Sequence, residues 1–436
     1  MSIEIKQVFS KDLGRANNYR IPSMITTKSG TIVACVDERW YGGGDNPNLI
    51  GKVVRRSTDN GKTWGEVIVA KEEVGKSKMT SSASIDPCLI YDEEKNIIVM
   101  IYTHTPAGVG ILRASKGLGV DKDGNRLVYN NNEIGVIKDN KIFVNNVDQG
   151  VVVDDIGNVK KDNKDIGNIY ERDGVYKEKN TFFLYSQTSY DEGLTWTEPI
   201  CLNNQVKEKY MSFIGVGPGA GVVIKNGKYK GRYVCPIYYN TASGTILMLS
   251  NAVIYSDDQG KTWQRGVSPN HNRKVLFYRV NEKLVLPTDM ITESQLIELP
   301  NGDLKLFMRN HNPKKRILTA ISKNGGMSWE NIKYQEELPH CICQCSVINA
   351  EDNGNPCTIF LNGADTKARK NGVIRLSYDY GESFPYSRQL VEGEFVYSSM
   401  VQMPNRQIGV LFEGSTKHES VDFTSVSIDW IKGEID

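Results

Sequence analysis

The sequence predicts an all-β protein, a six-bladed β-propeller with a β-rich insertion. Two interleaved repeats and the lack of helical periodicity carry this prediction. The first repeat is a polar turn that ends in an aromatic residue, and the second is a pair of apolar stretches separated by a polar turn. No amphipathic helix pattern of comparable length interrupts them. We therefore expect one domain over residues 1–436.

The polar turn reads S-x-D-x-G-x-T-W in its fullest form. Its copies are "STDNGKTW" (57–64), "SYDEGLTW" (189–196), "SDDQGKTW" (256–263), "SKNGGMSW" (322–329) and the weaker "SYDYGESF" (377–384). The carboxylate can accept backbone N–H bonds within the turn, and the glycine can adopt a positive φ. The fourth copy carries Asn324 in place of the acid, which keeps an acceptor but loses the charge.

The apolar pairs are typical of β-hairpins. They lie at residues 24–39, 89–104, 222–240, 296–310, 347–365 and 401–414. Each of the first five precedes one polar turn, and the sixth precedes "VDFTSVSIDW", an apolar strand that could close a ring. Closure into a ring protects strand edges, which suits a chain with this many strands.

The spacing of the hairpins predicts an insertion. The second interval is about twice the first, and the surplus lies at 106–180, a polar segment with short β-like runs such as "KIFV" and "GVVV". We expect a β-rich segment inserted within the second blade, which could overhang the centre of the ring.

Composition excludes several classes of partner. The formal net charge is +1 and no basic block is present, so neither nucleic acid nor a membrane surface is expected as a partner. No apolar run approaches the length of a membrane span. The start "MSIEIKQVFSKD" lacks the features of a signal peptide. This predicts either a cytoplasmic protein or a trimmed secreted or cell-surface one.

Metal and disulfide chemistry have little support in the sequence. Cys341, Cys343 and Cys345 alternate, so on a strand they would share one face, and we interpret them as buried core thiols. The alternative is a metal site, but no second C-x-x-C pair accompanies them. Only five histidines occur, without an H-E-x-x-H motif. We expect no metal and no cofactor.

Charged residues stand where the predicted strands end. In a propeller such ends converge from all blades onto one face, so residues distant in sequence can meet there. The candidates from this pattern are Arg20 in "NYRIPSMI", Asp37, Arg39, Arg309 and Arg369. A further carboxylate, Asp45, lies on the glycine-rich loop "YGGGDNP", which can be neither a helix nor the middle of a strand. A single arginine of this kind would be interpreted as a surface ion pair.

"YRIP" near the N-terminus, followed by S-x-D-x-G-x-T-W repeats in order, resembles the bacterial sialidases (exo-α-sialidases or neuraminidases) over nearly the whole chain. The resemblance implies that three arginines bind the carboxylate of the substrate. They match Arg20, Arg309 in "FMRN" and Arg369 in "ARKNG". It also implies that Glu413 in "VLFEG" steadies the first arginine, and that Arg39 and Asp86 touch the O4 and N-acyl side of the sugar.

The resemblance further implies the catalytic groups. The nucleophile and its base match Tyr397 in "FVYSSM" and Glu293 in "MITESQL", and the acid/base matches Asp45. Asp37 is the competing assignment for the acid, but it ends a strand and lacks the glycine-rich loop. A neutral phenol avoids the repulsion that a carboxylate nucleophile would meet at a carbon carrying a carboxylate, and sialidases with a Tyr nucleophile are a known exception among glycosidases. Since a free phenol has a pKa of about 10, it needs an adjacent base.

These residues predict a retaining exo-α-sialidase that hydrolyses terminal α-linked sialic acid through a covalent tyrosyl intermediate. Its expected partners are sialylated oligosaccharides, glycoproteins or glycolipids, and its expected state is a monomer. One alternative is an intramolecular trans-sialidase that releases an anhydro sugar, or an elimination that gives the 2,3-unsaturated sugar. An alternative from another class is a non-enzymatic Asp-box propeller that binds glycans or peptides.

Overall fold

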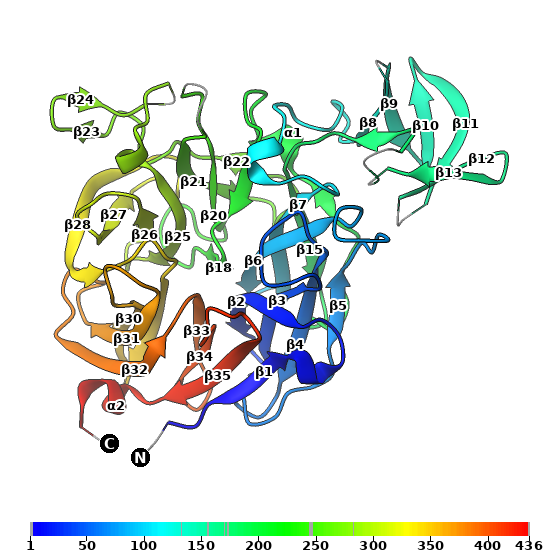
Figure 1. The fold of residues 1–436 in the computed structure, drawn as a ribbon. Helices are drawn as coiled ribbons and strands as arrows, with labels where there is room; N and C mark the ends of the chain where they lie inside the picture. The colour runs from blue at the N-terminus through cyan, green and yellow to red at the C-terminus, as the bar shows by residue number, and fades with distance from the viewer. Residues whose placement is uncertain are drawn as a thin grey trace.

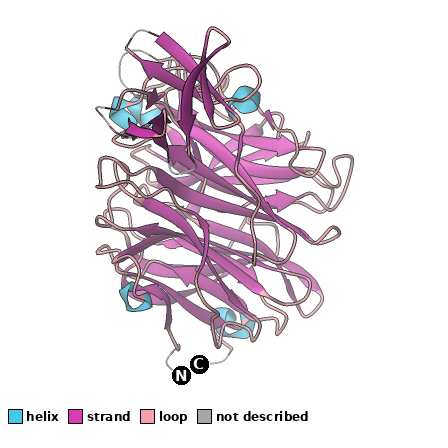
Figure 2. Ribbon diagram, turned by 90° about the vertical axis from the view of Figure 1, so that its right-hand side faces the viewer, coloured by secondary structure: helices cyan, strands magenta, loops and turns pink. Residues whose placement is uncertain are grey.

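The computed structural model describes residues 3–131, 133–154, 157–169, 171, 174–243, 247–281 and 283–434. Small antiparallel sheets are arranged around a common centre in a propeller-like ring, and the two ends of the chain lie close together (Figures 1 and 2). Among the described residues, no helix is long and apolar enough to cross a membrane. The all-β class predicted from the sequence is confirmed.

The first part of the ring is a nine-stranded sheet. On its main path lie β2 (Asn18–Thr26), β3 (Ile32–Arg39), β4 (Ile50–Ser57), β6 (Ala83–Asp92), β7 (Ile97–Thr105), β15 (Phe183–Ser189) and β16 (Ile200–Cys201), while β5 (Ile68–Lys71) pairs with β4 and β18 (Gly219–Ala220) pairs with β6. Its two halves meet through a single parallel pair, Ile50 with Ala83. The sheet therefore consists of two antiparallel groups joined at one point.

Four further sheets continue the ring or stand beside it. They comprise β17 (Ile214–Val216), β19 (Val222–Val223), β20 (Tyr233–Asn240), β21 (Leu249–Ser256) and β22 (Gln264–Arg265); the hairpin β23 (Lys274–Val275) and β24 (Tyr278–Arg279); β25 (Ile291–Glu298), β26 (Leu304–Asn310), β27 (Arg316–Ser322) and β28 (Glu330–Pro339); and β29 (Ser346–Asp352), β30 (Asn355–Gly363), β31 (Lys370–Ser377) and β32 (Tyr386–Glu394). The helices are short: α1 (Asn203–Val206), α2 (Ile428–Lys432), and the 3-10 turns Lys11–Leu13, Ile111–Arg113 and Pro287–Asp289.

The last sheet of the ring joins the two ends of the chain. It contains β33 (Ser398–Gln402), β34 (Ile408–Phe412), β35 (Ser420–Val426) and the N-terminal strand β1 (Lys6–Ser10). β1 pairs with β35 in antiparallel register, Lys6 opposite Phe423. The predicted strand in "VDFTSVSIDW" is thus present, and the N-terminal strand completes its sheet.

The segment predicted as an insertion contains a seven-stranded sheet. Its strands are β8 (Leu127–Asn130), β9 (Glu133–Lys138), β10 (Lys141–Val144), β11 (Val147–Val153), β12 (Asn158–Lys161), β13 (Lys164–Asn168) and β14 (Lys177–Glu178). In the view of Figure 1 this sheet lies at the upper right, outside the ring and not over its centre. Glu178 on β14 is buried and lies 3.6 Å from His104 on β7 and 3.7 Å from Arg126, so a buried polar contact connects the sheet to the ring.

The five repeat turns share one hydrogen-bond pattern. In the turn 256–263, Asp258 accepts from the Ser256 hydroxyl (2.8 Å), the Thr262 N–H (2.8 Å) and the Thr262 hydroxyl (2.6 Å). The Gly260 N–H donates to the Ser256 hydroxyl at 2.8 Å, and φ of Gly260 is +84°. Since every one of these bonds is local, the eight-residue motif itself is sufficient to form the turn.

The fourth turn keeps this shape with the polarity of one hydrogen bond reversed. The Ser328 N–H still donates to Oδ1 of Asn324 (2.8 Å), as predicted from the retained acceptor. The amide Nδ2 of Asn324, however, donates to the Ser328 hydroxyl at 2.8 Å, whereas the aspartates accept at that position. A hydroxyl can both donate and accept, so the turn tolerates the loss of the charge.

Three strands are kinked by a change in register near their N-terminal ends. The shifts fall between Arg20 and Ser23 on β2, between Ile85 and Cys88 on β6, and between Ile291 and Ser294 on β25. Ile21 and Asp86, each followed by proline, have φ of +57° and +62°, an uncommon conformation for these residue types. Such bulges re-aim side chains, and these three lie where Arg20, Asp86 and Glu293 leave their strands.

The interpretation of the cysteine cluster needs one correction. Cys341, Cys343 and Cys345 precede β29 in irregular structure, with Ile342 at φ +63°, so they do not share the face of a strand. Cys343 and Cys345 are buried, but Cys341 is half-buried. The left-handed residue breaks the alternation that a strand would have imposed.

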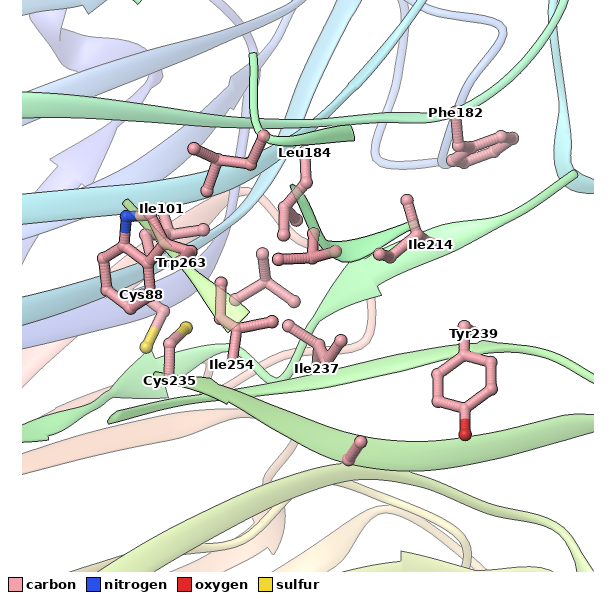
Figure 3. Close-up of a cluster of buried hydrophobic side chains, with 14 of the residues drawn as sticks. Cys88, Ile101, Phe182, Leu184, Ile214, Cys235, Ile237, Tyr239, Ile254 and Trp263 are labelled. Atoms are coloured by element: carbon pink, nitrogen blue, oxygen red, sulfur yellow. The ribbon is translucent and has the colours of Figure 1, made fainter. Parts of the chain in front are cut away.

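The core between neighbouring sheets is filled by apolar side chains, among them the buried ring of Trp263. Cys88, Ile101, Ile254 and Trp263 gather in the cluster of Figure 3. Trp263 is 2% exposed, and its indole N–H donates to the carbonyl of Gly260 at 3.0 Å. The aromatic end of this repeat turn therefore fastens the turn to the core.

We predict that Trp263→Ala destabilises the protein by roughly 3–5 kcal/mol, because it leaves a cavity in a packed core. Thermal unfolding measures the effect. Tyr190→Ala is the control, because Tyr190 is an aromatic residue of another repeat turn and is 66% exposed. Equal melting temperatures for the two variants would show that the ring of Trp263 is not a packing element.

Candidate active site

The predicted site residues meet in one cavity. It has a volume of about 260 Å³ and is lined by side chains from separate sheets of the ring: Arg20, Ile21, Asp45, Asp86, Ile111, Tyr238, Leu249, Thr292, Glu293, Arg309, His311, Arg369 and Tyr397. Of the nine residues predicted from the sequence, Arg39 and Glu413 do not line the cavity but lie directly behind it. Each bonds a residue that does.

Tyr397 and Glu293 form a hydrogen-bonded pair at the floor of the cavity. The Tyr397 hydroxyl donates to Oε1 of Glu293, and the Arg309 guanidinium donates to Oε2 of Glu293 (2.5 Å) and to the Tyr397 oxygen (2.9 Å). Burial raises the pKa of Tyr397, and Glu293 raises it further, so the phenol is neutral in the free protein. The Glu293 carboxylate is thus the acceptor of the hydrogen bond from the neutral phenol.

Three guanidinium groups surround this tyrosine. Arg309 contacts its oxygen, while the guanidinium carbons of Arg20 and Arg369 lie 5.5 Å and 5.7 Å from its ring centre. Arg369 precedes β31 and is half-buried, and Arg20 is 7% exposed. Guanidinium groups bind carboxylates through paired N–H donors and stay charged at any working pH. The arrangement can therefore hold an acidic ligand over Tyr397.

Glu413 holds the first of these arginines. Its carboxylate accepts from Arg20 Nε (3.1 Å), from the Ile21 N–H (2.8 Å) and from His418 Nδ1 (3.0 Å), and it is fully buried. Burial by itself would raise the pKa of Glu413, but Arg20 and the hydrogen bonds from His418 and Ile21 lower it to about 2. Glu413 is therefore an anion over the working pH range.

Asp45 lies on the loop between β3 and β4 with 67% of its side chain exposed. Its Oδ1 accepts from Arg39 at 2.8 Å and lies 3.7 Å from Arg20. Partial burial would raise the pKa of Asp45, but the attraction of Arg39 and Arg20 is larger and lowers it. In the free protein Asp45 is thus ionised.

The loop that carries Asp45 is tied down by an asparagine that sequence reasoning missed. Asn48 donates to the carbonyls of Gly42 and Gly44, both at 2.9 Å, and accepts from the Tyr41 N–H at 3.1 Å. Asn48 is fully buried. The only sequence signal was an Asn-Pro-Asn run after three glycines, which indicates a turn but not its partners.

A buried ion network lies beneath Asp45. Asp37 accepts from Arg39 at 2.7 Å, from Lys52, and from the Asp86 N–H at 3.1 Å. Asp37 is fully buried, so it cannot reach a ligand in the cavity and is excluded as the acid. Lys52 was missed, although a lysine inside the apolar strand "LIGKVV" is the kind of signal that indicates a buried ion pair.

The pKa of Asp86 is shifted in the opposite direction to the pKa of Asp45. It is 9% exposed and lies at the wall of the cavity. Burial raises the pKa of Asp86 well above its ordinary value, and the nearby carboxylates of Asp37 and Glu293 raise it further. A protonated carboxyl can donate a hydrogen bond, so Asp86 is suited to a ligand oxygen that an ionised acid would repel.

Several lining residues had no role in the sequence interpretation. Ile111 comes from the segment before the seven-stranded sheet, Leu249 begins β21, and Tyr238 lies near the end of β20. His311 also lines the cavity, and burial together with Arg309 lowers its pKa to about 4. Ile111 and Leu249 make one wall of the cavity apolar. No local pattern distinguishes these residues from other core or surface positions.

Comparisons with known proteins identify relatives of this chain. The model of the BNR repeat-like domain matches residues 170–410. The "Anhydrosialidase" of Macrobdella decora is 26% identical over 93% of this chain and 59% of its own length. The "Sialidase" of Bacteroides fragilis (strain YCH46) is 28% identical over 92% of this chain and 60% of its own. The chain thus spans less than two thirds of the length of these relatives.

A solved structure shares the fold. The intramolecular trans-sialidase from Ruminococcus gnavus, in complex with oseltamivir carboxylate, superposes with a TM-score of 0.81 at 23% identity. The match covers 98% of each chain. This likeness establishes the fold, while the cavity residues carry the argument about chemistry.

We predict that Glu413→Gln lowers the free energy of unfolding at pH 7 by about 3–5 kcal/mol, because it leaves Arg20 buried without its anion. The native pKa of Glu413 is about 2 and the ordinary value is 4.5. Its stabilisation is therefore fully present above pH 4.5 and is lost as the pH falls toward 2.

Urea unfolding of both proteins from pH 7 to pH 3 measures this difference. The difference in the free energy of unfolding between the wild type and Glu413→Gln should become smaller below pH 4.5. Glu419→Gln, an exposed position on the same loop, serves as the control. A gap that stays constant with pH would contradict the assigned charge of Glu413.

Proposed function

We propose that this chain, which belongs to the BNR repeat-like domain family, is an exo-α-sialidase that cleaves terminal α-linked sialic acid from oligosaccharides, glycoproteins or glycolipids. One observation carries the proposal: three arginines surround a tyrosine whose hydroxyl is bonded to a buried glutamate. A non-enzymatic glycan-binding propeller would have no use for the Tyr397–Glu293 pair. The sialidase names of the curated relatives support the same activity.

We also propose that the ring has six blades and that residues 106–180 are inserted in the second. The support is a grouping of the strands into five sets of four and one of five: β2–β5; β6, β7, β15 and β16; β19–β22 with β17; β25–β28; β29–β32; and β33–β35 with β1. Each group begins with one of the six predicted hairpins. The seven-stranded sheet lies between β7 and β15 of the second group.

In the proposed reaction the substrate carboxylate binds to Arg20, Arg309 and Arg369. This places the anomeric carbon over the Tyr397 oxygen. Asp86 is proposed to face the O4 and N-acyl side of the sugar, whereas Arg39, which is fully buried behind the cavity, holds Asp45. The negative charge of the substrate also offsets the attraction of Arg20 for Asp45, so the pKa of Asp45 rises in the complex.

The first step breaks the glycosidic bond. The Tyr397 oxygen attacks the anomeric carbon and its proton passes to Glu293, while Asp45 protonates the departing glycosidic oxygen. In the second step a water molecule attacks the same carbon, Asp45 accepts its proton, and Glu293 returns a proton to Tyr397. Two inversions give net retention.

A second candidate within this site is the intramolecular transfer that releases an anhydro sugar. The name of the Macrobdella decora relative and the apolar wall formed by Ile111 and Leu249 favour it. Such a wall can restrict water, so that a hydroxyl of the sugar itself displaces Tyr397. Incubation with α2,3- and α2,6-sialyllactose separates the outcomes: hydrolysis releases free sialic acid, and transfer or elimination releases a product lighter by one water. The intact trisaccharide after prolonged incubation would contradict the proposed function.

We predict that Tyr397→Phe binds a sialic acid ligand but loses turnover, because the nucleophilic oxygen is absent and the arginines remain. A 3-fluoro sialosyl fluoride should add one sialosyl mass to the wild type, located on Tyr397 by peptide mapping, and none to Tyr397→Phe. Tyr190→Phe, which removes an exposed hydroxyl away from the cavity, should label like the wild type. A label on another residue would overturn the role of Tyr397.

Asp45→Ala should behave differently, because it removes the leaving-group acid and keeps the nucleophile. An aryl sialoside needs little protonation of its leaving oxygen, so we expect kcat/KM for it to fall much less than kcat/KM for sialyllactose. Protonation by a positioned acid contributes about 10²–10⁴-fold, which sets the size of the difference. Equal losses on both substrates would assign Asp45 to binding.

A further inference from the structure

We propose that His418 is a positioning residue for this reaction, one that couples the carboxylate behind Arg20 to the loop that carries Asp45. The inference rests on the proposed function for its kinetic consequences. Its structural part concerns only His418, Glu413 and the glycine loop.

The first link is a hydrogen bond to Glu413. Nδ1 of His418 lies 3.0 Å from Oε2 of Glu413, the same oxygen that Arg20 Nε contacts at 3.1 Å. A carboxylate with a pKa of about 2 only accepts, so Nδ1 is the donor. Because Glu413 is fully buried, each group that donates a hydrogen bond to it affects the position of its carboxylate. His418 thus helps to fix the carboxylate that orients Arg20.

The second link is steric contact with Gly43, two residues before Asp45. A methyl group added at Gly43 would lie 2.9 Å from Cβ and 3.0 Å from Cδ2 of His418. The loop backbone therefore packs directly on the His418 side chain, and only glycine fits there. The carbonyl of Gly43 accepts from Arg39 at 2.8 Å, and Arg39 also bonds Asp45. The position of Gly43 therefore affects the position of the Asp45 carboxylate through Arg39.

The backbone of His418 is held without its ring. Its carbonyl accepts from the Tyr19 N–H (3.0 Å) and from the side chain of Asn18 (3.2 Å). Its φ is +59°, a conformation that glycine and asparagine adopt more readily than most residues. Substitution by either residue should therefore leave the local fold in place, and the imidazole can be tested by itself.

Three substitutions separate the two links. His418→Asn keeps a donor in the position of Nδ1 and keeps the contact with Gly43. His418→Leu keeps the contact and loses the donor, with a backbone strain at φ +59° that should affect both substrates equally. His418→Gly loses both links without that strain. We expect the Kd for 2-deoxy-2,3-didehydro sialic acid to rise about tenfold in the Leu and Gly variants, the effect of one hydrogen bond to a charged group. It should stay within about threefold of wild type in the Asn variant.

The loop link has its own readout. His418→Gly should lose more kcat/KM on sialyllactose than on an aryl sialoside, in the same direction as Asp45→Ala, because misplacement of the acid by about 1 Å can cost up to 10²-fold. His418→Leu should keep the wild-type ratio between the two substrates. If the role of His418 were purely structural, kcat/KM for the two substrates would fall by the same factor in every variant.

Two alanine substitutions test the loop from the other side. Gly43→Ala should shift the loop and change the substrate ratio in the wild-type background, but it should change the ratio no further in His418→Gly, where Cβ of His418 is absent. Gly44→Ala is the matched control, since a methyl group there meets nothing within 4 Å. If Gly43→Ala behaves like Gly44→Ala, the proposed contact is wrong.

Amide hydrogen exchange in residues 41–46 needs no substrate, so it separates failure of this proposal from failure of the proposed function. Exchange should be faster in His418→Gly and Gly43→Ala than in the wild type, and unchanged in His418→Asn and Gly44→Ala. If exchange is faster in His418→Gly and Gly43→Ala, but the wild type neither binds nor cleaves sialosides, only the sialidase assignment is overturned. Unchanged exchange and unchanged ligand affinity in all His418 variants would overturn the role of His418.

Discussion

Positive charge concentrated in one cavity is the constraint on which the rest of the site depends. Arg20, Arg309 and Arg369 converge on Tyr397, and buried guanidinium groups are tolerated only where anions compensate them. Glu413 supplies such an anion behind the cavity, and Glu293 supplies one in its lining. The side chains of all three arginines nevertheless line the cavity, so an acidic ligand can reach them.

The surroundings shift the pKa values of the carboxyl groups in opposite directions. Arg39 and Arg20 lower the pKa of Asp45, whereas burial and the neighbouring acids raise the pKa of Asp86. Tyr397 stays neutral because burial disfavours its anion. An acid with a lowered pKa, an acid with a raised pKa and a neutral phenol thus line one cavity. Environments that drive such pKa values apart are typical of catalytic sites.

Backbone geometry brings these groups together. The register shifts on β2, β6 and β25 turn Arg20, Asp86 and Glu293 out of their strands near the N-terminal ends. The long polar segment between β7 and β15 forms its own sheet outside the ring, and among its described residues only Ile111 lines the cavity.

The sequence by itself determined the all-β class, the hairpins and the five repeat turns, because the contacts that form them lie within a few residues of one another. The predicted resemblance to sialidases is confirmed by the curated relatives. Only the tertiary structure decided that Asp37 is buried, that Lys52 and Asn48 support the site, and that His418 contacts Glu413. These facts depend on which strand ends meet after the ring closes and on how much water each charge retains, and no local pattern encodes either.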